Sequence, residues 1–440
     1  MCYEHINQLT GGQRMSLFNV NISIINRFCD NFKDNFSNTQ FRAFAMLPYA
    51  MLKDYKRLNL SSLAKELPIN YQALQYFLAE AHWDYESLNT IRINLLRKHR
   101  TTGFSKNGVL AIDDTGSLKP YAKKTEGVAY QYCPATKEKA YCNVVVVSCY
   151  ANLTKHIPLG LKFYKPEAEF IPLRKNDPDF KSKLDFAMEL IEEAITAGIL
   201  FSHIVFDSWY SSCDMIDFID DLGKKFISEV KSDRRLLVDH PVSKKKIWIQ
   251  QDELVKLIKK HLWHKTRMIN YNGKLVPAYA FNARVKDTQV NLKAFVIMGK
   301  WSEEDDKSAH ILITNDLALD HKKTASIYRL RWGIEHAFQE LKDSFYFDHY
   351  QVRHKEKIMR YWMLCFLVWT LIYWIRQNAY LHKTITTNSS TCNEYKRALL
   401  TLIEFSSYAA LRKNDSLRAE YFSSIKSIIS QEAYQESNTI

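Results

Sequence analysis

Hydrophobic residues three and four positions apart dominate the first hundred residues and predict a mostly helical region. Residues 61–67 and 71–78 have this pattern on either side of Pro68, which should end the first helix. Ser61 or Ser62 is suited to cap that helix. The pattern predicts either a helix-turn-helix or an ordinary helical hairpin. In the first case the side chains near base edges would be those of Asn70, Tyr71, Gln72 and Gln75.

The pattern changes after residue 100, where short apolar runs predict strands. Three strands are expected at residues 108–115, 143–150 and 157–164, followed by a helix at 179–199. A strand at 202–210, a helix at 213–222 and a strand at 226–230 complete the series. The first and fourth strands lead into acids, namely Asp113 and Asp114 in one and Asp207 in the other. A further helix, from residues 81–86 through the basic segment 92–100, precedes the series, and its positive charge is expected to contact phosphates.

A Lys-rich segment with further strand patterns separates this series from the next helix. Strands are expected at residues 246–249, 266–270, 291–297 and 310–314. The segment is too long for a simple loop, so we expect a β-rich insertion.

Residues 328–342 predict one amphipathic helix with two neighbouring stripes. Its apolar stripe consists of Leu330, Ile334, Phe338, Leu341 and Phe345. The second stripe consists of Tyr328, Arg331, Glu335 and Lys342, which an ideal helix would place within a roughly 60° arc. One carboxylate would therefore lie among cationic and phenolic side chains at the edge of a buried face.

The apolar run at residues 361–375 is shorter than the roughly 20 residues of a spanning helix, so we expect a buried core helix. Two more helices are expected at residues 393–404 and 417–431.

Composition narrows the class of protein. The 440 residues, 46% of them hydrophobic, suffice for two or three domains. A net charge of +13 and a pI near 9.1 favour a polyanionic partner, with nucleic acid as the leading candidate. The eight cysteines form no CxxC pair and no zinc-like spacing, which indicates a reduced protein without a structural zinc. Asn19, Asn21, Asn26 and Arg27 interrupt any apolar core of a signal peptide, so we expect a cytoplasmic protein.

The spacing of Tyr328, Arg331, Glu335 and Lys342 resembles the Tyr-(2)-Arg-(3)-Glu-(6)-Lys signature of bacterial insertion-sequence DDE transposases. The two preceding aspartate blocks, the order of strands and helices, and the position of the insertion are similar too. The resemblance covers about residues 60–380. It implies a ribonuclease H-like mixed α/β sheet flanked by helices, with a β-rich insertion and a helical N-terminal domain.

The resemblance also implies site residues. Asp113, Asp207 and Glu335 would be the catalytic acids and hold two Mg²⁺ ions, for which Mn²⁺ can substitute. Asp114 is the alternative to Asp113, because the family's Asp-x-Thr motif can be aligned on either acid. Strand alternation directs the two acids to opposite faces, so only one should reach the metal ions. Tyr328, Arg331 and Lys342 would hold DNA phosphates, as would Lys119, Lys123 and Lys124 in the loop after the first aspartate. In relatives that form a hairpin at the transposon end, a tryptophan of the insertion holds a flipped base; the candidates here are Trp248, Trp263 and Trp301.

The resulting expectation is a cut-and-paste DNA transposase. It would bind terminal inverted repeats, cleave the transposon ends and join them to target DNA, as a homodimer on double-stranded DNA and without a membrane. Two alternatives stay open: a ribonuclease H-like nuclease without strand transfer, and a catalytically dead, transposase-derived DNA-binding regulator. The expected regions are an N-terminal DNA-binding region (1–100), a catalytic core in two parts (101–232 and 324–382), the insertion (233–323) and a helical C-terminal region (383–440).

Overall fold

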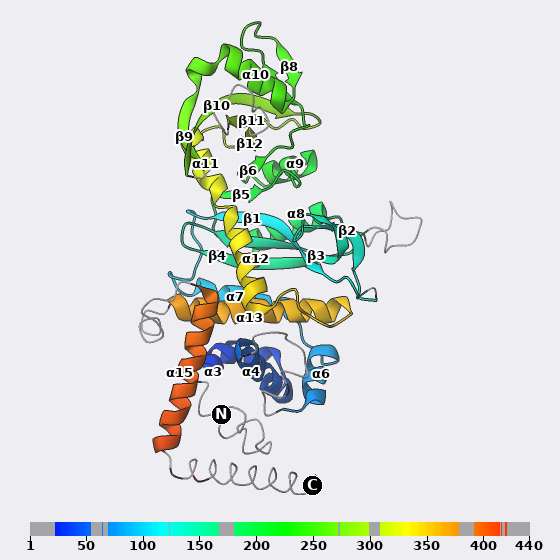
Figure 1. Ribbon diagram of the computed structural model, residues 1–440, viewed down its shortest axis with the longest axis vertical. Coiled ribbons are helices and arrows are strands. Elements are labelled where there is room, and N and C mark those ends of the chain that lie inside the picture. The colour runs from blue at the N-terminus through cyan, green and yellow to red at the C-terminus, as the bar shows by residue number, and fades with distance from the viewer. Residues whose placement is uncertain are drawn as a thin grey trace, which may run out of the picture. The chain divides into compact units, whose positions relative to one another are not determined.

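The computed structural model describes residues 23–53, 64, 69–122, 124–166, 180–271, 273–298, 309–377, 391–413, 415 and 419. The contacts between residues divide the chain into two compact units, drawn in Figure 1. The sheet unit comprises Phe104–Lys123 and Gly127–Phe338, and the helical unit comprises Met1–Gly103, Lys124–Glu126 and Gln339–Ile440.

Five strands form the core of the sheet unit: β1 (Val109–Leu118), β3 (Glu138–Ala151), β4 (His156–Tyr164), β5 (His203–Phe206) and β6 (Phe226–Glu229). β3 pairs antiparallel with both β4 and β1, whereas β5 pairs parallel with β1 and β6 pairs parallel with β5. The spatial order is therefore β4, β3, β1, β5, β6, with a short extra strand, β2 (Ala129–Cys133), on β3. This mixed sheet with flanking helices has the ribonuclease H-like order that the sequence predicted.

Two helices connect the parallel strands, and their first residues explain where they begin. α8 (Lys183–Thr196) starts with a capping box, in which Ser182 and Asp185 each bond the backbone of the other. α9 (Cys213–Asp221) starts at Ser212, whose hydroxyl accepts from the backbone N–H of Met215. The apolar side of α8, including Leu190 and Ile191, is buried.

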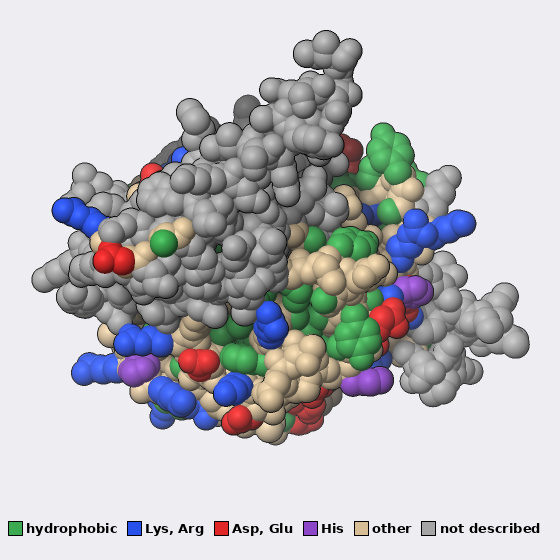
Figure 2. All heavy atoms as spheres, turned by 90° about the horizontal axis from the view of Figure 1, so that it is seen from below, with side chains coloured by type: hydrophobic (Ala, Val, Ile, Leu, Met, Phe, Trp, Pro, Cys, Tyr) green, Lys and Arg blue, Asp and Glu red, His purple; other side chains and the backbone are tan. Residues whose placement is uncertain are grey.

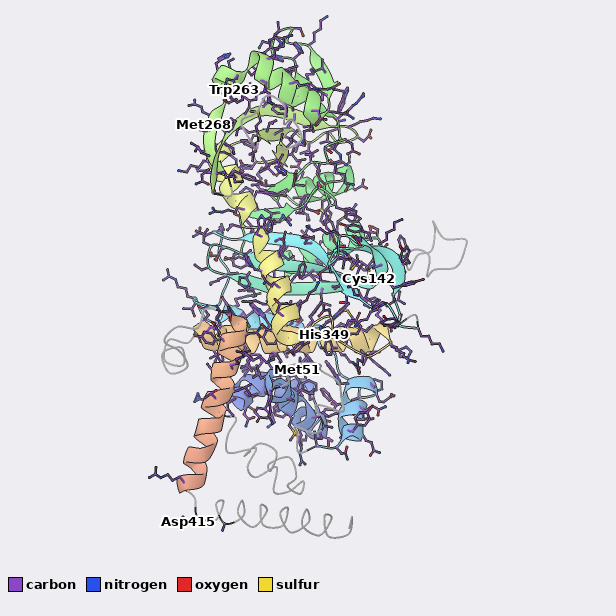
Figure 3. All side chains as sticks on the ribbon, viewed as in Figure 1. Met51, Cys142, Trp263, Met268, His349 and Asp415 are labelled. Atoms are coloured by element: carbon purple, nitrogen blue, oxygen red, sulfur yellow. The ribbon has the colours of Figure 1, made fainter. Side chains whose placement is uncertain are left out.

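The insertion has more structure than its sequence suggested. It contains β7 (Leu236–Asp239), β8 (Lys246–Ile249), α10 (Gln251–His261), the 3-10 helix η4 (Trp263–Lys265), β9 (Arg267–Tyr271), β10 (Lys274–Val285), β11 (Leu292–Ile297) and β12 (His310–Thr314). β12 pairs with β6, and β11 and β10 follow, so these insertion strands continue the core sheet. Neither β10 nor α10 was predicted, because β10 has no regular alternation and α10 has only three turns. Figure 3 labels Trp263 beside α10 and Met268 on β9.

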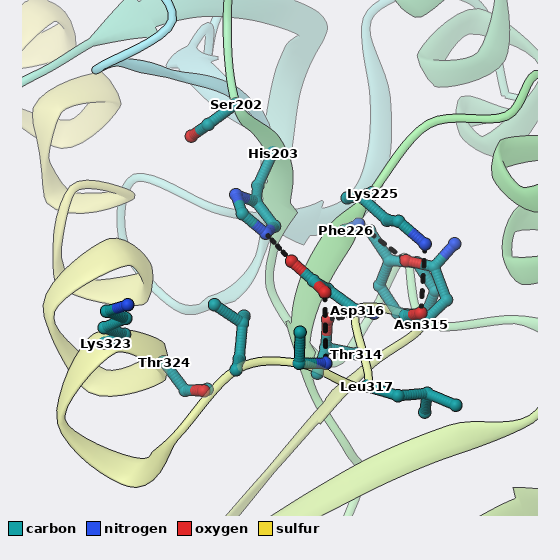
Figure 4. A network of polar contacts seen from close by, with 12 residues as sticks. Ser202, His203, Lys225, Phe226, Thr314, Asn315, Asp316, Leu317, Lys323 and Thr324 are labelled. Carbon is teal, nitrogen blue, oxygen red and sulfur yellow. Dashed lines mark hydrogen bonds and ion pairs between the residues drawn. The ribbon is translucent and has the colours of Figure 1, made fainter.

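A polar network fastens the end of β12 to the beginning of β5 and β6 (Figure 4). The buried His203 Nε2 lies 3.3 Å from Asp316 Oδ2. Asn315 accepts a 3.0 Å bond from the backbone N–H of Phe226 and a 3.3 Å bond from Lys225 Nζ. These contacts fix the start of the connection that leads to the next helix, α11 (His321–Arg329).

The helical unit contains α3 (Ser23–Cys29), the 3-10 helix η1 (Asp30–Asn35), α4 (Asn38–Lys53), α6 (Tyr71–Ala79), α7 (Tyr85–Arg97), α13 (Lys355–Gln377) and α15 (Cys392–Lys413). α13 packs against α4, α6, α7 and α15 and forms the core of this unit. Its buried Arg360 bonds the carbonyl oxygens of Leu78 and Trp83 and lies over the Trp83 ring. In Figure 2, Lys and Arg side chains are mixed with Asp and Glu side chains around a group of hydrophobic residues.

α13 is the one helix among the described residues that is long and apolar enough to cross a membrane, but 94% of its most apolar window is buried inside the protein. The prediction of a buried core helix at residues 361–375 is therefore confirmed.

The division into units differs from the boundaries expected from the sequence. The helix α12 (Trp332–Phe345) is split between Phe338 and Gln339, and everything after it belongs with the N-terminal helices. The reason is that α13, expected to complete the catalytic core, contributes its apolar surface to α4, α6 and α7 instead.

Candidate active site

The helix predicted at residues 328–342 is two helices. α11 ends at Arg329 and α12 begins at Trp332. At the break, Arg331 N–H donates to Tyr328 O and Ile334 N–H donates to Arg331 O, which are the tighter bonds of a 3-10 turn. The single 60° arc was therefore wrong, because Tyr328 and Glu335 lie on different helices.

Gly333 gives a packing reason for the position of α12. A Cβ added at Gly333 would lie 2.5 Å from the Ala151 Cβ on β3, closer than real carbon contacts allow. Glycine thus permits the first turn of α12 to approach the sheet directly. The buried side of this helix includes Ile334, Ala337 and Leu341.

Asp113 and Asp207 lie on adjacent parallel strands. Ile112 is the partner of Phe206 in the last pair of the β1–β5 ladder, and the two aspartates are the next residue of each chain. The sequence predicted that the first strand ends at its acids. Instead, β1 continues to Leu118 and remains paired with β3. The two aspartates nevertheless lie where β5 ends. The pairing of β1 with β5 stops at Ile112, whereas its pairing with β3 continues past Asp113.

Asp113 and Asp114 point to opposite faces of the sheet. Asp113 Oδ2 accepts a 3.1 Å bond from Arg331, in the turn between α11 and α12. Asp114 Oδ2 accepts a 2.5 Å bond from Lys183 at the start of α8. Only Asp113 shares the face on which Glu335 lies, which is the geometry that strand alternation predicts.

Arg331 links the two acids that come from distant parts of the sequence. One guanidinium nitrogen bonds Asp113, and another bonds Glu335 Oε1 at 2.8 Å. The Arg331 side chain is only 13% exposed and also lies over the rings of Tyr328 and Trp332. Such planar, charge-assisted contacts hold Glu335 toward the strand acids.

The strand acids lie in a setting that opposes their ionisation. Burial, followed by the negative charge of Asp207, raises the pKa of Asp113 to about 8 despite the nearby Arg331. Burial also raises the pKa of Asp207, although the backbone N–H of Trp209 donates to its Oδ1 at 2.9 Å. Two close carboxylates in a poorly hydrated site favour a bound cation.

Two buried tyrosines border the acids. Tyr210 follows Asp207 and is fully buried, and Tyr328 at the end of α11 is 5% exposed. Within the described part of the chain, neither hydroxyl has a hydrogen-bond partner. Burial raises the pKa of both phenols, so both remain protonated donors.

The donor set fits hard divalent cations, since carboxylate oxygens are the ligands that such ions prefer. Asp113 and Asp207 supply oxygens whose ionised form a cation would stabilise, and Glu335 adjoins them through Arg331. Among the described residues, however, no three acidic, histidine or cysteine side chains lie close enough together to hold a metal ion. Arg331 bonds both Asp113 and Glu335 in this arrangement.

The other residues predicted to contact DNA differ in their exposure to solvent. Lys119 is half-buried and Lys124 is exposed, whereas Lys123 lies outside the described residues. Lys342 lies in the last turn of α12, within the helical unit. Arg92, in the basic segment expected to contact phosphates, is fully buried and bonds Asn89 and Thr370, so that expectation is wrong for this residue.

The helix-turn-helix prediction is described only in its second half, because residues 61–63 and 65–68 lie outside the described ranges. α6 begins at Asn70, whose side chain accepts a 2.7 Å bond from Ala73 N–H and so caps the helix. Tyr71, Gln72 and Gln75 are exposed on α6.

The three tryptophans of the insertion that could hold a flipped base also differ in their exposure and surroundings. Trp248 on β8 is 43% exposed and lines a cavity of about 560 Å³ together with Arg234, Arg235 and Lys286. Trp263 lies half-buried in η4, away from this lining, and Trp301 is outside the described residues.

Sequence reasoning missed two groups near the acids, because Glu229 and His310 were not singled out. Glu229 is the last residue of β6, so its place at a strand end, beside the strand that delivers Asp207, was a usable signal.

Comparisons with known proteins found two family models and a relative that match this chain. Residues 31–248 match the family model described as "DDE superfamily endonuclease", and residues 182–371 match "Transposase DDE domain". The "Probable transposase for insertion sequence element IS701" of Microchaete diplosiphon is 28% identical over 217 residues, which are 48% of this chain. The match spans 54% of that relative, about half its length.

Among solved structures, the "Drosophila P element transposase strand transfer complex" aligns with 56% of this chain and 52% of its own, at 16% identity and a TM-score of 0.22. A TM-score this low adds nothing to the family matches. Over these ranges the chain is similar to DDE endonuclease and transposase domains and to an insertion-sequence transposase.

Proposed function

We propose that this protein is an insertion-sequence DNA transposase that binds terminal inverted repeats, cleaves the transposon ends and joins them to target DNA. The observation that carries the proposal is the convergence of Asp113 and Asp207 at one edge of a ribonuclease H-like sheet, with Glu335 linked to Asp113 by Arg331. The match to transposase family models supports the same assignment.

The proposed roles follow from the donor set. Asp113, Asp207 and Glu335 are the metal-binding acids, with Mg²⁺ as the expected ion and Mn²⁺ as a substitute. Divalent ions at this position supply activation of the attacking water or 3′-hydroxyl and stabilisation of the leaving oxygen. The residues of the chain hold these ligands in place and exclude bulk water.

Arg331 and Tyr328 are proposed to contact the DNA backbone. Arg331 bonds Asp113 and Glu335, and its guanidinium can also donate to a phosphate oxygen. Tyr328 has an unpartnered hydroxyl within the described part of the chain and can donate to a phosphate oxygen. Lys342, Lys119, Lys123 and Lys124 are proposed as further phosphate contacts, as in the Tyr-Arg-Glu-Lys signature and the loop that the sequence resembles.

The cavity beside Trp248 supports a finer proposal about excision. Its half-exposed indole can stack on a base, and Arg234, Arg235 and Lys286 can neutralise the adjoining phosphates. This arrangement suits a flipped base at a hairpin end. Action on two ends further implies a homodimer on DNA, and action on chromosomal DNA implies a cytoplasmic, nucleoid-associated protein.

The direct test uses purified protein and a labelled duplex containing the sequence that flanks its gene. With Mg²⁺, we expect cuts at the element's ends, followed by joining of the freed 3′ ends to a second, unlabelled DNA. Chelation of the metal should abolish both steps. Cutting without joining would instead establish the nuclease alternative, and binding without cutting the regulator alternative.

A further inference from the structure

Two further strands, β6 and β12, extend the row of polar residues that begins with Asp113 and Asp207. Phe206 is paired with Ser228 in the parallel β5–β6 ladder, so Glu229, the last residue of β6, lies beside Asp207, the residue after β5. Glu229 in turn is paired with Leu312 of β12, and His310 lies two residues before Leu312 on the same strand face. Glu229 and His310 therefore continue this row of polar residues across the sheet.

Glu229 and His310 form a close pair. His310 Nδ1 lies 2.5 Å from Glu229 Oε1, and the two side chains are 49% and 30% exposed, respectively. The hydrogen bond to Glu229 raises the pKa of His310, so the imidazole carries a positive charge in the neutral range more often than a free histidine. In the described residues no partner is found for His310 Nε2, which is thus available as a donor.

Two phenols border the same pair. The Tyr271 ring lies 6.4 Å from the His310 ring, and burial and then the charge of Glu229 raise the pKa of Tyr271. The Tyr328 hydroxyl also lies within the field of Glu229 and Tyr271, and it is buried without a partner among the described side chains. The His310 ring can donate from Nε2 and each phenol can donate its O–H, while Glu229 is paired with His310.

A set of donors beside metal-binding acids suits an anionic oxygen rather than another cation. We propose that His310, held by Glu229 and flanked by Tyr271 and Tyr328, binds a backbone phosphate of the DNA strand next to the phosphate that is cut. The inference rests on the proposed transposase function and adds a subsite formed by the insertion strands β9 and β12. Those strands would then align the DNA across the catalytic edge.

The test measures binding of the labelled duplex with the gene's flanking sequence, as a function of salt concentration at mildly acidic pH. His310→Asn removes the cation and should weaken binding about tenfold and lower the salt slope by about one. His310→Arg keeps a cation and should bind within about threefold of the wild type. The matched control is His264→Asn, an exposed histidine of the same insertion, which should bind as the wild type does. Circular dichroism spectra establish that each variant is folded.

The outcomes separate the two proposals. If the wild type binds and cuts the duplex but His310→Asn retains wild-type affinity and salt slope, the phosphate subsite is wrong and the transposase proposal stands. Equal losses in His310→Asn and His264→Asn would also overturn the subsite. If the wild type does not bind the duplex at all, both proposals fail.

Discussion

At the scale of single residues, two kinds of charge interaction define the candidate site: repulsion between two aspartates and attraction of carboxylates to Arg331. Asp113 and Asp207 repel each other in a buried setting, and Arg331 alone among the described side chains bonds Asp113 and Glu335 together. The sequence singled out Asp113 and Asp207 because each follows an apolar run, and strand alternation predicted that Asp113 and Asp114 point to opposite faces. It did not predict that Arg331 bonds the acids, since that contact joins residues 218 positions apart.

Asp113→Asn should stabilise the metal-free protein increasingly as pH rises. The pKa of Asp113 is raised to about 8, so its contribution to folding is fully present below the unfolded pKa and is lost as pH rises toward 8. We expect the variant to gain on the order of 2 kcal/mol relative to the wild type at the upper end of this range. Thermal unfolding in chelator, followed by circular dichroism, measures the difference.

The control for that series is Asp343→Asn, at an exposed position of α12. It should show no comparable change with pH. A stability difference for Asp113→Asn that stays constant from acid to neutral pH would contradict the electrostatic account. Added Mg²⁺ should raise the melting temperature of the wild type and leave that of Asp113→Asn nearly unchanged.

At the scale of elements, periodicity predicted the core strands well because each is apolar and separated by clear turns. Periodicity gave wrong boundaries where contacts with distant residues outweigh the local hydrophobic pattern. The heptad-like spacing through residues 328–342 suggested one helix, but 3-10 bonding at Arg331 and the close approach of Gly333 to β3 divide it. Long β10 and short α10 were missed because the pairing of strands and the burial of short helices depend on distant neighbours.

Gly333→Ala tests whether this close approach positions Glu335. The added methyl group would meet Ala151 at 2.5 Å, so α12 must move away from β3. We expect a loss of about 1–3 kcal/mol in the free energy of unfolding and a loss of cleavage that exceeds the loss of DNA binding. Gln339→Ala, at an exposed position of the same helix, should change stability by less than about 0.5 kcal/mol. Full cleavage activity in Gly333→Ala would show that the approach is dispensable.

The connection between β5 and the end of β12 should make stability depend on pH. Burial lowers the pKa of His203, so its contribution is present above the unfolded value near 6.5 and is lost as pH falls. The wild type should therefore lose about 1 kcal/mol more than His203→Gln between neutral pH and about pH 5. Urea unfolding at both pH values measures this, with His264→Gln as the exposed control. Identical pH profiles for the wild type and His203→Gln would rule out this role.

At the scale of the whole molecule, the sequence predicted the class of fold but not its grouping into units. The order of strands and helices sufficed for a ribonuclease H-like sheet, because that order restricts the topologies available. The grouping depends on which helices share an apolar surface, and α13 shares its surface with the N-terminal helices. Nor did sequence pattern reveal that insertion strands extend the core sheet through the β6–β12 ladder, which brings Glu229 and His310 into line with the aspartates.

The measurement that tests the account most directly is Mg²⁺-dependent cleavage of the element's ends by the wild type, Asp113→Asn, Asp207→Asn, Glu335→Gln and the matched variant Asp114→Asn. We predict that the first three variants bind the DNA normally but cleave it about a thousandfold more slowly or worse, whereas Asp114→Asn retains activity within about tenfold. Wild-type cleavage by Asp207→Asn or Glu335→Gln would contradict the assignment of the site. Loss of cleavage in Asp114→Asn but not in Asp113→Asn would place the first acid on the opposite face of the sheet.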